Sequence, residues 1–118
     1  MPEFTTALSM DDQAALLHGI FSDGDVGMCV VDEAGRFLLV NSAYCAIYGY
    51  QREELLGTHF TVMVPSDGRE QAAATHRRFL DEGVARNGEW DVLTRAGERL
   101  RVRLHSVLVA LPDGRRFR

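Results

Sequence analysis

Residues 27–57 read GMCVVDEAGRFLLVNSAYCAIYGYQREELLG, and this stretch decides the fold. Two short apolar runs, Met28–Val31 and Phe37–Val40, flank the turn sequence Asp-Glu-Ala-Gly, which predicts a β-hairpin. From Asn41 onward apolar residues recur at helical spacing until Gly49, and one more helical turn follows before the last glycine. The stretch therefore predicts a hairpin that leads directly into two short helices.

The order of residues in this stretch resembles the PAS family of sensor domains. The pattern D-x-x-G-x-F-x-x-V-N-x-A-Y, followed by G-Y-x-x-E-E-L-L-G, runs from Asp32 to Gly57 at the family's spacings. The resemblance implies an α+β fold with a five-stranded antiparallel sheet, short helices packed on one face and an N-terminal flanking helix. A weaker likeness continues through Phe60, Pro65, Arg69, His76, Phe79, Gly88, Glu89, Gly97, Asp113 and Gly114.

Two polar residues of the pattern have a structural explanation. An aspartate in a turn, such as Asp32, bonds to nearby backbone groups, and an asparagine between a strand and a helix, such as Asn41, caps the helix. We therefore expect both to determine the fold and not the choice of ligand.

The bulk properties are those of one globular domain. A chain of 118 residues, 46% of them hydrophobic, can form a core of its own. No apolar run approaches the ~20 residues that cross a bilayer, and residues 1–10 lack a signal-peptide pattern, so we expect a cytoplasmic protein without a membrane partner. Cys29 and Cys45 are too far apart for a zinc knuckle or a redox pair, which predicts two reduced structural cysteines.

Charge is distributed unevenly along the chain. Residues 1–35 contain seven acidic residues and no base, whereas residues 95–118 contain seven arginines and two acids. A basic patch can bind nucleic acid, but no recognition helix or aromatic stacking motif accompanies this one. We expect a solvated or internally paired face and no nucleic-acid partner.

The chain divides into two parts in this interpretation. Residues 1–22 comprise a tail, residues 1–8, and an amphipathic flanking helix whose start is marked by the capping box of Ser9 and Asp12. Residues 23–118 form the PAS domain. Its last strand is expected to be short and the family's exit linker to be missing, so that the effector domain lies outside this chain.

A long strand, residues 100–111, is expected to lie partly under a cover. Apolar and charged residues alternate up to Ser106, as in a sheet with one buried face, and beyond Ser106 the alternation fails. We expect the N-terminal helix of this chain or of a dimer partner to cover the outer face there, with Asp11 and Asp12 near Arg101 or Arg103. The candidate residues for this cover and for a homodimer are Leu17, Ile20, Phe21, Val107, Val109 and Leu111.

The chain lacks patterns that would support catalysis or metal binding. The histidines are not spaced as H-x-x-x-H or H-E-x-x-H, no G-x-S-x-G motif occurs, and the glycines form no phosphate-binding loop. We therefore expect no enzyme and no metal site. The four histidines are His18, His59, His76 and His105.

Haem and flavin are both considered and neither is expected. His76 is the one polar residue on the apolar face of a predicted helix, residues 69–81, but in the haem oxygen sensors of the family the ligand lies one turn earlier, at Ala72. The light-sensing LOV branch of the family needs a cysteine in the segment that corresponds to Thr58–Met63, which contains none. Trp90 would suit a flavin held without a covalent bond.

The resemblance implies an apolar cavity between the helices and the sheet. Either a small apolar ligand binds there or the side chains fill the space, and the residues alone leave both open. The candidate lining residues are Met28, Val30, Phe37, Leu39, Ile47, Tyr48, Leu56, Phe60, Met63, Ala72, His76, Trp90, Val102, Leu104 and Ser106.

The function implied by the resemblance is that of a non-catalytic input domain for signal transduction, as in bacterial-type two-component systems. Such a domain binds a ligand or dimerises and controls an effector, namely a histidine kinase, a diguanylate cyclase or a transcription regulator. The alternative is a ligand-free module for protein interaction and dimerisation.

Overall fold

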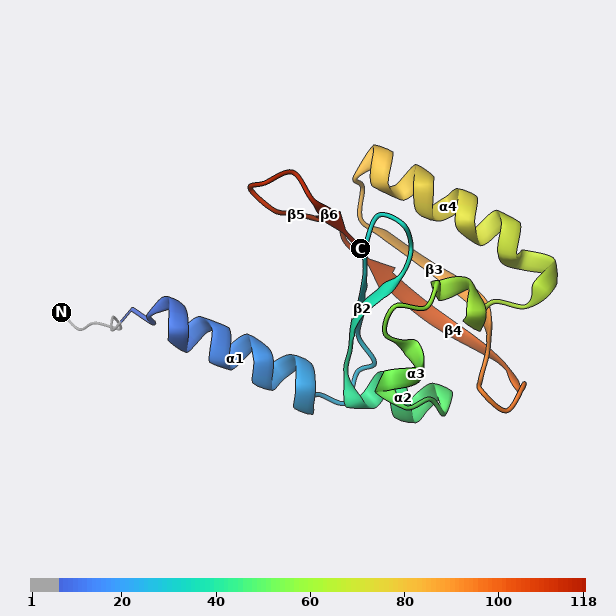
Figure 1. The fold of residues 1–118 in the computed structure, drawn as a ribbon, viewed down its shortest axis with the longest axis horizontal. Helices are drawn as coiled ribbons and strands as arrows, with labels where there is room; N and C mark the ends of the chain where they lie inside the picture. The colour runs from blue at the N-terminus through green and yellow to red at the C-terminus, as the bar shows by residue number, and fades with distance from the viewer. Residues whose placement is uncertain (1–6) are drawn as a thin grey trace.

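The computed structural model describes residues 7–118, so most of the predicted tail lies outside the described residues. The hairpin and the two short helices predicted from residues 27–57 are confirmed (Figure 1). In chain order the elements are α1 (Met10–Asp23), β1 (Cys29–Val31), β2 (Phe37–Val40), α2 (Ser42–Tyr48), α3 (Arg52–Leu55), η1 (Phe60–Met63), η2 (Ser66–Gly68), α4 (Arg69–Glu82), β3 (Arg86–Leu93), β4 (Arg99–Ser106), β5 (Val109–Ala110) and β6 (Arg116–Phe117).

The turn between β1 and β2 depends on a glycine. Gly35 has φ 84°, and a Cβ placed there would lie 2.6 Å from Nε2 of His59, so both the backbone conformation and the space exclude a side chain. Asp32 completes the turn, because its Oδ1 accepts a hydrogen bond from the backbone N–H of Arg36 at 2.9 Å. The turn role predicted for Asp32 is thus confirmed.

The strands pair as antiparallel neighbours: β1 with β2, β3 with β4, and β5 with β6. Val31 and Arg118 exchange two backbone hydrogen bonds, of 2.8 and 3.0 Å, which join the end of the chain to β1. The predicted strand over residues 100–111 is interrupted at Val107 and Leu108, so β4 and β5 stand in its place. The result is the predicted mixed fold of helices and antiparallel strands, but the strands pair as three two-stranded sheets where one sheet of five strands was expected.

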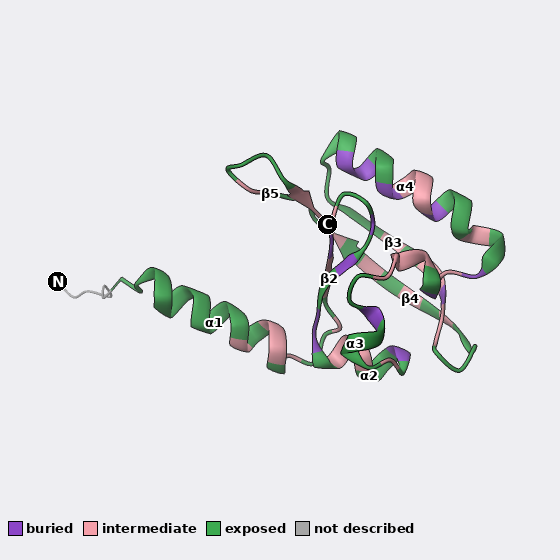
Figure 2. Ribbon diagram, in the orientation of Figure 1, coloured by how far each residue is buried: buried purple, intermediate pink, exposed green. Residues whose placement is uncertain are grey.

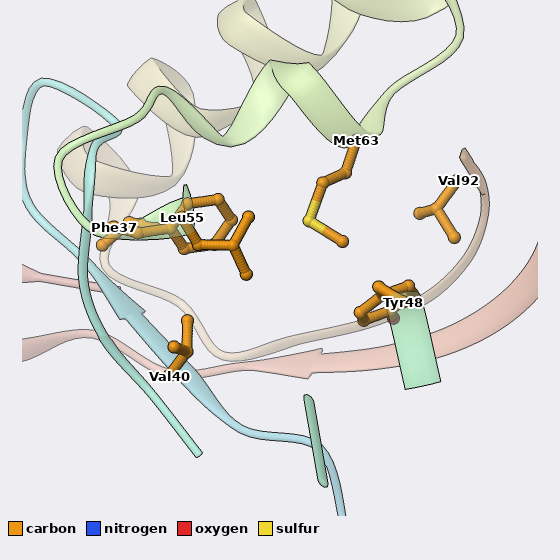
Figure 3. Packing of buried hydrophobic residues seen from close by; sticks show 7 residues of the cluster. Phe37, Val40, Tyr48, Leu55, Met63 and Val92 are labelled. Atoms are coloured by element: carbon orange, nitrogen blue, oxygen red, sulfur yellow. The ribbon is translucent and has the colours of Figure 1, made fainter. Parts of the chain in front are cut away.

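The core lies where the short helices meet the strands. Seven buried residues form it, and the six labelled in Figure 3 come from β2, α2, α3, η1 and β3. On β4, residues 100, 102 and 104 are half-buried and residues 101, 103 and 105 are exposed, which confirms the predicted alternation. The core residues are Val31, Phe37, Val40, Tyr48, Leu55, Met63 and Val92.

The N-terminal helix α1 extends away from the rest of the domain (Figure 1). Its capping box is formed as predicted, since Ser9 Oγ accepts from the N–H of Asp12 at 3.0 Å and Asp12 Oδ2 accepts from the N–H of Ser9 at 3.2 Å. None of its residues is buried, and Figure 2 colours most of it as exposed.

The expectation that α1 covers the sheet of its own chain is therefore wrong. Among residues 7–118, helix α1 packs against α2, and it has no comparable packing against β4 or β5. Arg101 and Arg103 make their ion pairs with Glu89 and Asp91 on the neighbouring strand β3 and not with the acids of α1. The cross-strand partners are nearer, because they are fixed opposite the arginines by the β3–β4 register. A cover supplied by a partner chain stays a prediction.

Candidate ligand site and interaction surface

Part of the predicted lining lies together in the interior. Phe37, Tyr48, Met63, Ala72 and His76 are buried, and they come from β2, α2, η1 and α4. Six other residues of the predicted lining are half-buried. These are Val30, Phe60, Trp90, Val102, Leu104 and Ser106.

Four residues of the predicted lining are instead on the surface. Met28, Leu39, Ile47 and Leu56 expose 36%, 53%, 46% and 41% of their area, so the prediction placed them in the wrong orientation. The register of β1 and β2 shifts between Val30 and Val31, which changes the side of the sheet to which the residues point. The neighbours that point inward instead are Cys29, Val31, Val40, Tyr44 and Leu55.

Tyr44 is an interior residue that the sequence analysis missed. Its ring lies edge-on between Phe37 and Tyr48, at centroid distances of 5.8 and 4.7 Å, and its hydroxyl donates to Met63 Sδ at 3.3 Å. Burial raises the pKa of Tyr44 well above its usual 10. The spacing of Tyr44 and Tyr48, one helical turn apart, is a signal that could have identified this inward face.

Cys29 lies beside Tyr44 and is also protonated at neutral pH. Burial raises the pKa of its thiol, and the nearby Tyr44 hydroxyl and the charge of Arg118 oppose this only partly. Both cysteines of the chain, Cys29 and Cys45, are free thiols. The interior therefore contains two hydrogen-bond donors, the Tyr44 hydroxyl and the weaker Cys29 thiol, and no negative charge from them.

His76 has a partner for each of its ring nitrogens. Nε2 lies 3.1 Å from the carbonyl oxygen of Glu33, and Nδ1 lies 3.0 Å from Nε of Arg118. Because Nε of arginine is always a donor, Nδ1 must accept and Nε2 must carry the proton, which defines a neutral tautomer. With both nitrogens occupied, His76 offers no free ligand to a haem iron.

Arg118 is the second interior residue that the sequence analysis missed. Its guanidinium carbon lies 4.8 Å from the centroid of Phe60, and burial lowers the pKa of the guanidinium. An arginine at the end of a short strand gives no sequence signal of burial. The hydrogen-bonded pairing with Val31 is what brings it into the domain.

The state of His76 should make the stability of the domain depend on pH. Burial and the charge of Arg118 lower the pKa of His76 below its usual 6.5, so the unfolded chain binds a proton at a pH where the folded chain does not. The free energy of unfolding should therefore fall as the pH drops below about 6.5 and stop falling below the pKa of the folded state.

Urea denaturation at about pH 7.5 and about pH 5.5 measures this loss of stability between the two values. His76→Gln should reduce the loss, and His18→Gln on the exposed helix α1 should leave it unchanged. Some dependence should persist in His76→Gln, because burial also lowers the pKa of His59. A loss as large in His76→Gln as in the wild type would refute the assignment.

Apolar side chains are exposed at both ends of the described chain. On α1, Leu17 and Ile20 expose 65% and 60% of their area, and at the start of the last hairpin Val107 and Val109 expose 47% and 49%. Phe21 and Leu111 are half-buried. Two shallow hollows of about 470 and 480 Å³ lie along α1 and its junction with α2, and both are lined by Asp23 and Gly24.

The outer face of β3 and β4 is an ion-pair ladder. Arg101 bonds to Asp91 at 3.0 Å and to Glu89 at 3.5 Å, and Arg103 bonds to Glu89 at 3.4 Å. The arginines of the basic segment on this face are therefore internally paired, as predicted.

Within residues 7–118 no three metal-binding side chains gather, and no helix is both long and apolar enough to cross a membrane.

Comparison with known proteins places this fold among sensor domains. The family model described as "PAS fold" matches residues 15–117, and the chain belongs to the PAS family. No curated protein sequence matches the chain.

Solved structures agree with this assignment. A domain of a sensory box sensor histidine kinase/response regulator from Geobacter sulfurreducens is 30% identical, with a TM-score of 0.76 over 92% of this chain and 93% of that chain. The PAS domain of an HTR-like protein from Haloarcula marismortui is 23% identical, with a TM-score of 0.77 over 92% and 88%. A LOV protein from Rhodobacter sphaeroides is 20% identical, with a TM-score of 0.72 over 92% and 64%. The chain is thus a PAS sensory domain that resembles those of histidine kinases, and PAS sensory domains are generally non-catalytic.

Proposed function

We propose that this PAS domain is the non-catalytic input module of a signalling protein, and that it acts as a homodimer. The observation that carries the proposal is the apolar surface of α1, which projects from the domain with Leu17 and Ile20 exposed. Exposed apolar patches of this kind are typical of protein interfaces. In this proposal residues 1–22 are the flanking segment, residues 23–118 are the sensor, and the effector is a histidine kinase, a diguanylate cyclase or a transcription regulator outside this chain.

The exposed valines near the C-terminus are the proposed receiving surface. Val107 and Val109 lie next to the arginine-bearing strand β4, whereas α1 carries Asp11 and Asp12 and no base. Pairing α1 with a second α1 would set acids against acids. Placing α1 on the valines of a partner buries apolar area on both chains and sets opposite charges near each other.

The interior is the proposed site of a small ligand. It combines the apolar core with a few polar groups at its edge, the combination that ligand sites usually have. No haem, flavin or metal is part of this proposal. Its alternative is a ligand-free interaction module, which the packing of seven buried side chains into one cluster favours. The proposal places the domain in the cytoplasm, where both free thiols would stay reduced.

Charged substitutions in the proposed interface should abolish dimerisation. Leu17→Glu and Val109→Glu should each convert the dimer to a monomer in sedimentation analysis, because a carboxylate would be buried without a partner. Val84→Glu is the matched control, since Val84 exposes 59% of its area and lies outside the proposed interface. A wild-type monomer, or a dimer that survives both substitutions, would refute the homodimer.

The choice between a ligand site and a ligand-free module needs a separate measurement. Mass spectrometry of the denatured protein should detect a co-purified small molecule in about molar equivalence if the interior holds a ligand. Its absence, together with a stable dimer, would favour the interaction module.

A further inference from the structure

We propose that Arg118 is an anion-recognition residue at the edge of the interior and that it binds the carboxylate of a small organic acid. The inference rests on the proposed sensory function and names the class of ligand. It starts from the surroundings of the guanidinium group, which lies between the ring of Phe60 and Nδ1 of His76.

No acidic side chain of residues 7–118 forms an ion pair with Arg118. Arg116, two residues earlier, is by contrast paired with Glu33 at 3.0 Å. The ionisable groups that favour its charge are the Cys29 thiol and the Tyr44 hydroxyl, and both are neutral at pH 7 because burial raises their pKa values. A half-buried cation without a counterion is unfavourable, and an incoming anion would relieve this.

The free donors of Arg118 are accessible. Nε donates to His76, while Nη1 and Nη2 donate to no residue that the structure describes. Every buried side-chain nitrogen and oxygen in the described part of the chain has a partner, so these two nitrogens lie where solvent or a ligand reaches them. The two Nη groups form the end of the guanidinium fork, whose spacing matches the two oxygens of a carboxylate.

The groups near Arg118 also favour a ligand that accepts hydrogen bonds. The Tyr44 hydroxyl now donates to a thioether sulfur, which is a weak acceptor, and the Cys29 thiol is a weak donor. The site thus has more donors than good acceptors. A monocarboxylate fits better than a phosphate, because one guanidinium supplies one positive charge and the surroundings, such as Phe60 and Met63, are apolar.

His76 and the backbone hold the guanidinium in place for this role. The bond from Nε to His76 fixes the plane of the fork, and the two backbone bonds to Val31 fix its position on the sheet. His76 is therefore a positioning residue. A bound carboxylate would act directly on the last strand, since Arg118 belongs to the segment that pairs with β1.

The test is a titration with butyrate, followed by NMR through the backbone amides of Val31 and Arg118. Butyrate should cause saturable shifts, and butyramide, which has nearly the same shape without the charge, should bind at least tenfold more weakly. Arg118→Met, which keeps an apolar side chain and the backbone bonds, should weaken butyrate binding roughly tenfold to hundredfold, as expected for charge-assisted hydrogen bonds. Arg103→Met, on the outer ladder, should change it less than twofold.

The comparison of butyrate with butyramide in the wild type tests the carboxylate inference even if Arg118→Met fails to fold. Arg118→Lys is a second variant, which keeps the charge but lacks the guanidinium fork, and it should bind butyrate more weakly than the wild type does. Equal binding of butyrate and butyramide would overturn the carboxylate inference and leave the sensory proposal intact. No saturable shift with butyrate, or an equal loss in Arg103→Met, would overturn the inference as well. The sensory proposal is judged separately by the dimer and co-purification experiments.

Discussion

Leu55→Ala should lower the free energy of unfolding by about 3–5 kcal/mol, the range for a fully buried leucine that leaves a cavity. Leu55 is 0% exposed at the end of α3 and belongs to the core cluster, where Figure 3 places it beside Phe37. Domains of this size have a total stability of about 5–15 kcal/mol, so the variant should be close to unfolding. Urea denaturation of the wild type and the variant measures the difference.

The adjacent residue provides the control for this experiment. Leu56 has the same side chain, but it is 41% exposed, and Leu56→Ala should cost less than about 1 kcal/mol. Both variants remove the same atoms, but one removes them from the buried side of the turn and the other from the exposed side. Equal losses would mean that Leu55 is not part of a close-packed core.

Asn41→Ala should destabilise the domain by about 3–5 kcal/mol, because it leaves three backbone groups without a partner. Asn41 is 0% exposed. Its Oδ1 accepts from the N–H groups of Met28 and Tyr44, both at 2.9 Å, and its Nδ2 donates to the carbonyl oxygen of Val26 at 2.8 Å. The side chain therefore caps α2 and also joins the helix to the chain that enters β1.

Two variants separate these roles of Asn41. Asn41→Asp keeps the acceptor for both N–H groups and loses the donor to Val26, so its loss of stability should be intermediate. Ser42→Ala, one residue further along and exposed, should change stability by less than about 0.5 kcal/mol. Thermal or urea unfolding measures all three. A loss in Asn41→Ala no larger than in Ser42→Ala would contradict the hydrogen-bond assignment.

The parts of the fold that depend on turns and caps were predictable from the sequence. At the cap of Asn41 and the capping box of Ser9, side chains bond to nearby backbone groups. In the turn, Asp32 does the same, and Gly35 can adopt a positive φ because it has no side chain. These are local effects, so sequence spacing is sufficient to detect them. The family resemblance rests on the same kind of residue.

The orientation of the apolar side chains was less predictable. In Met28–Val31 and in Leu55-Leu56 every residue is apolar or nearly so, and a pattern without polar interruptions does not say which side faces the core. In β1, the irregular register at Val30 and Val31 then determines which side chains face the core. Only long-range packing settles such positions.

The interior polar site was not predictable for a similar reason. Arg118 and His76 are 42 residues apart, and their contact exists only because backbone pairing brings the last residue beside β1. No spacing rule relates the two. The exposed surface of α1 was inferred as an amphipathic stripe, but the sequence could not show that the helix would leave its own sheet uncovered.

The joint between β1 and the final residues has a consequence for local unfolding. Two backbone hydrogen bonds to Val31 and the contacts of Arg116 and Arg118 hold the last segment, while its partner β5 has only two residues, both exposed. Backbone hydrogen bonds contribute about 0.5–1.5 kcal/mol each, so this segment can detach at a small fraction of the free energy that unfolds the core. We therefore expect the last hairpin to open as a separate cooperative unit, so that its amide hydrogens exchange with solvent while those of β3 and β4 remain protected.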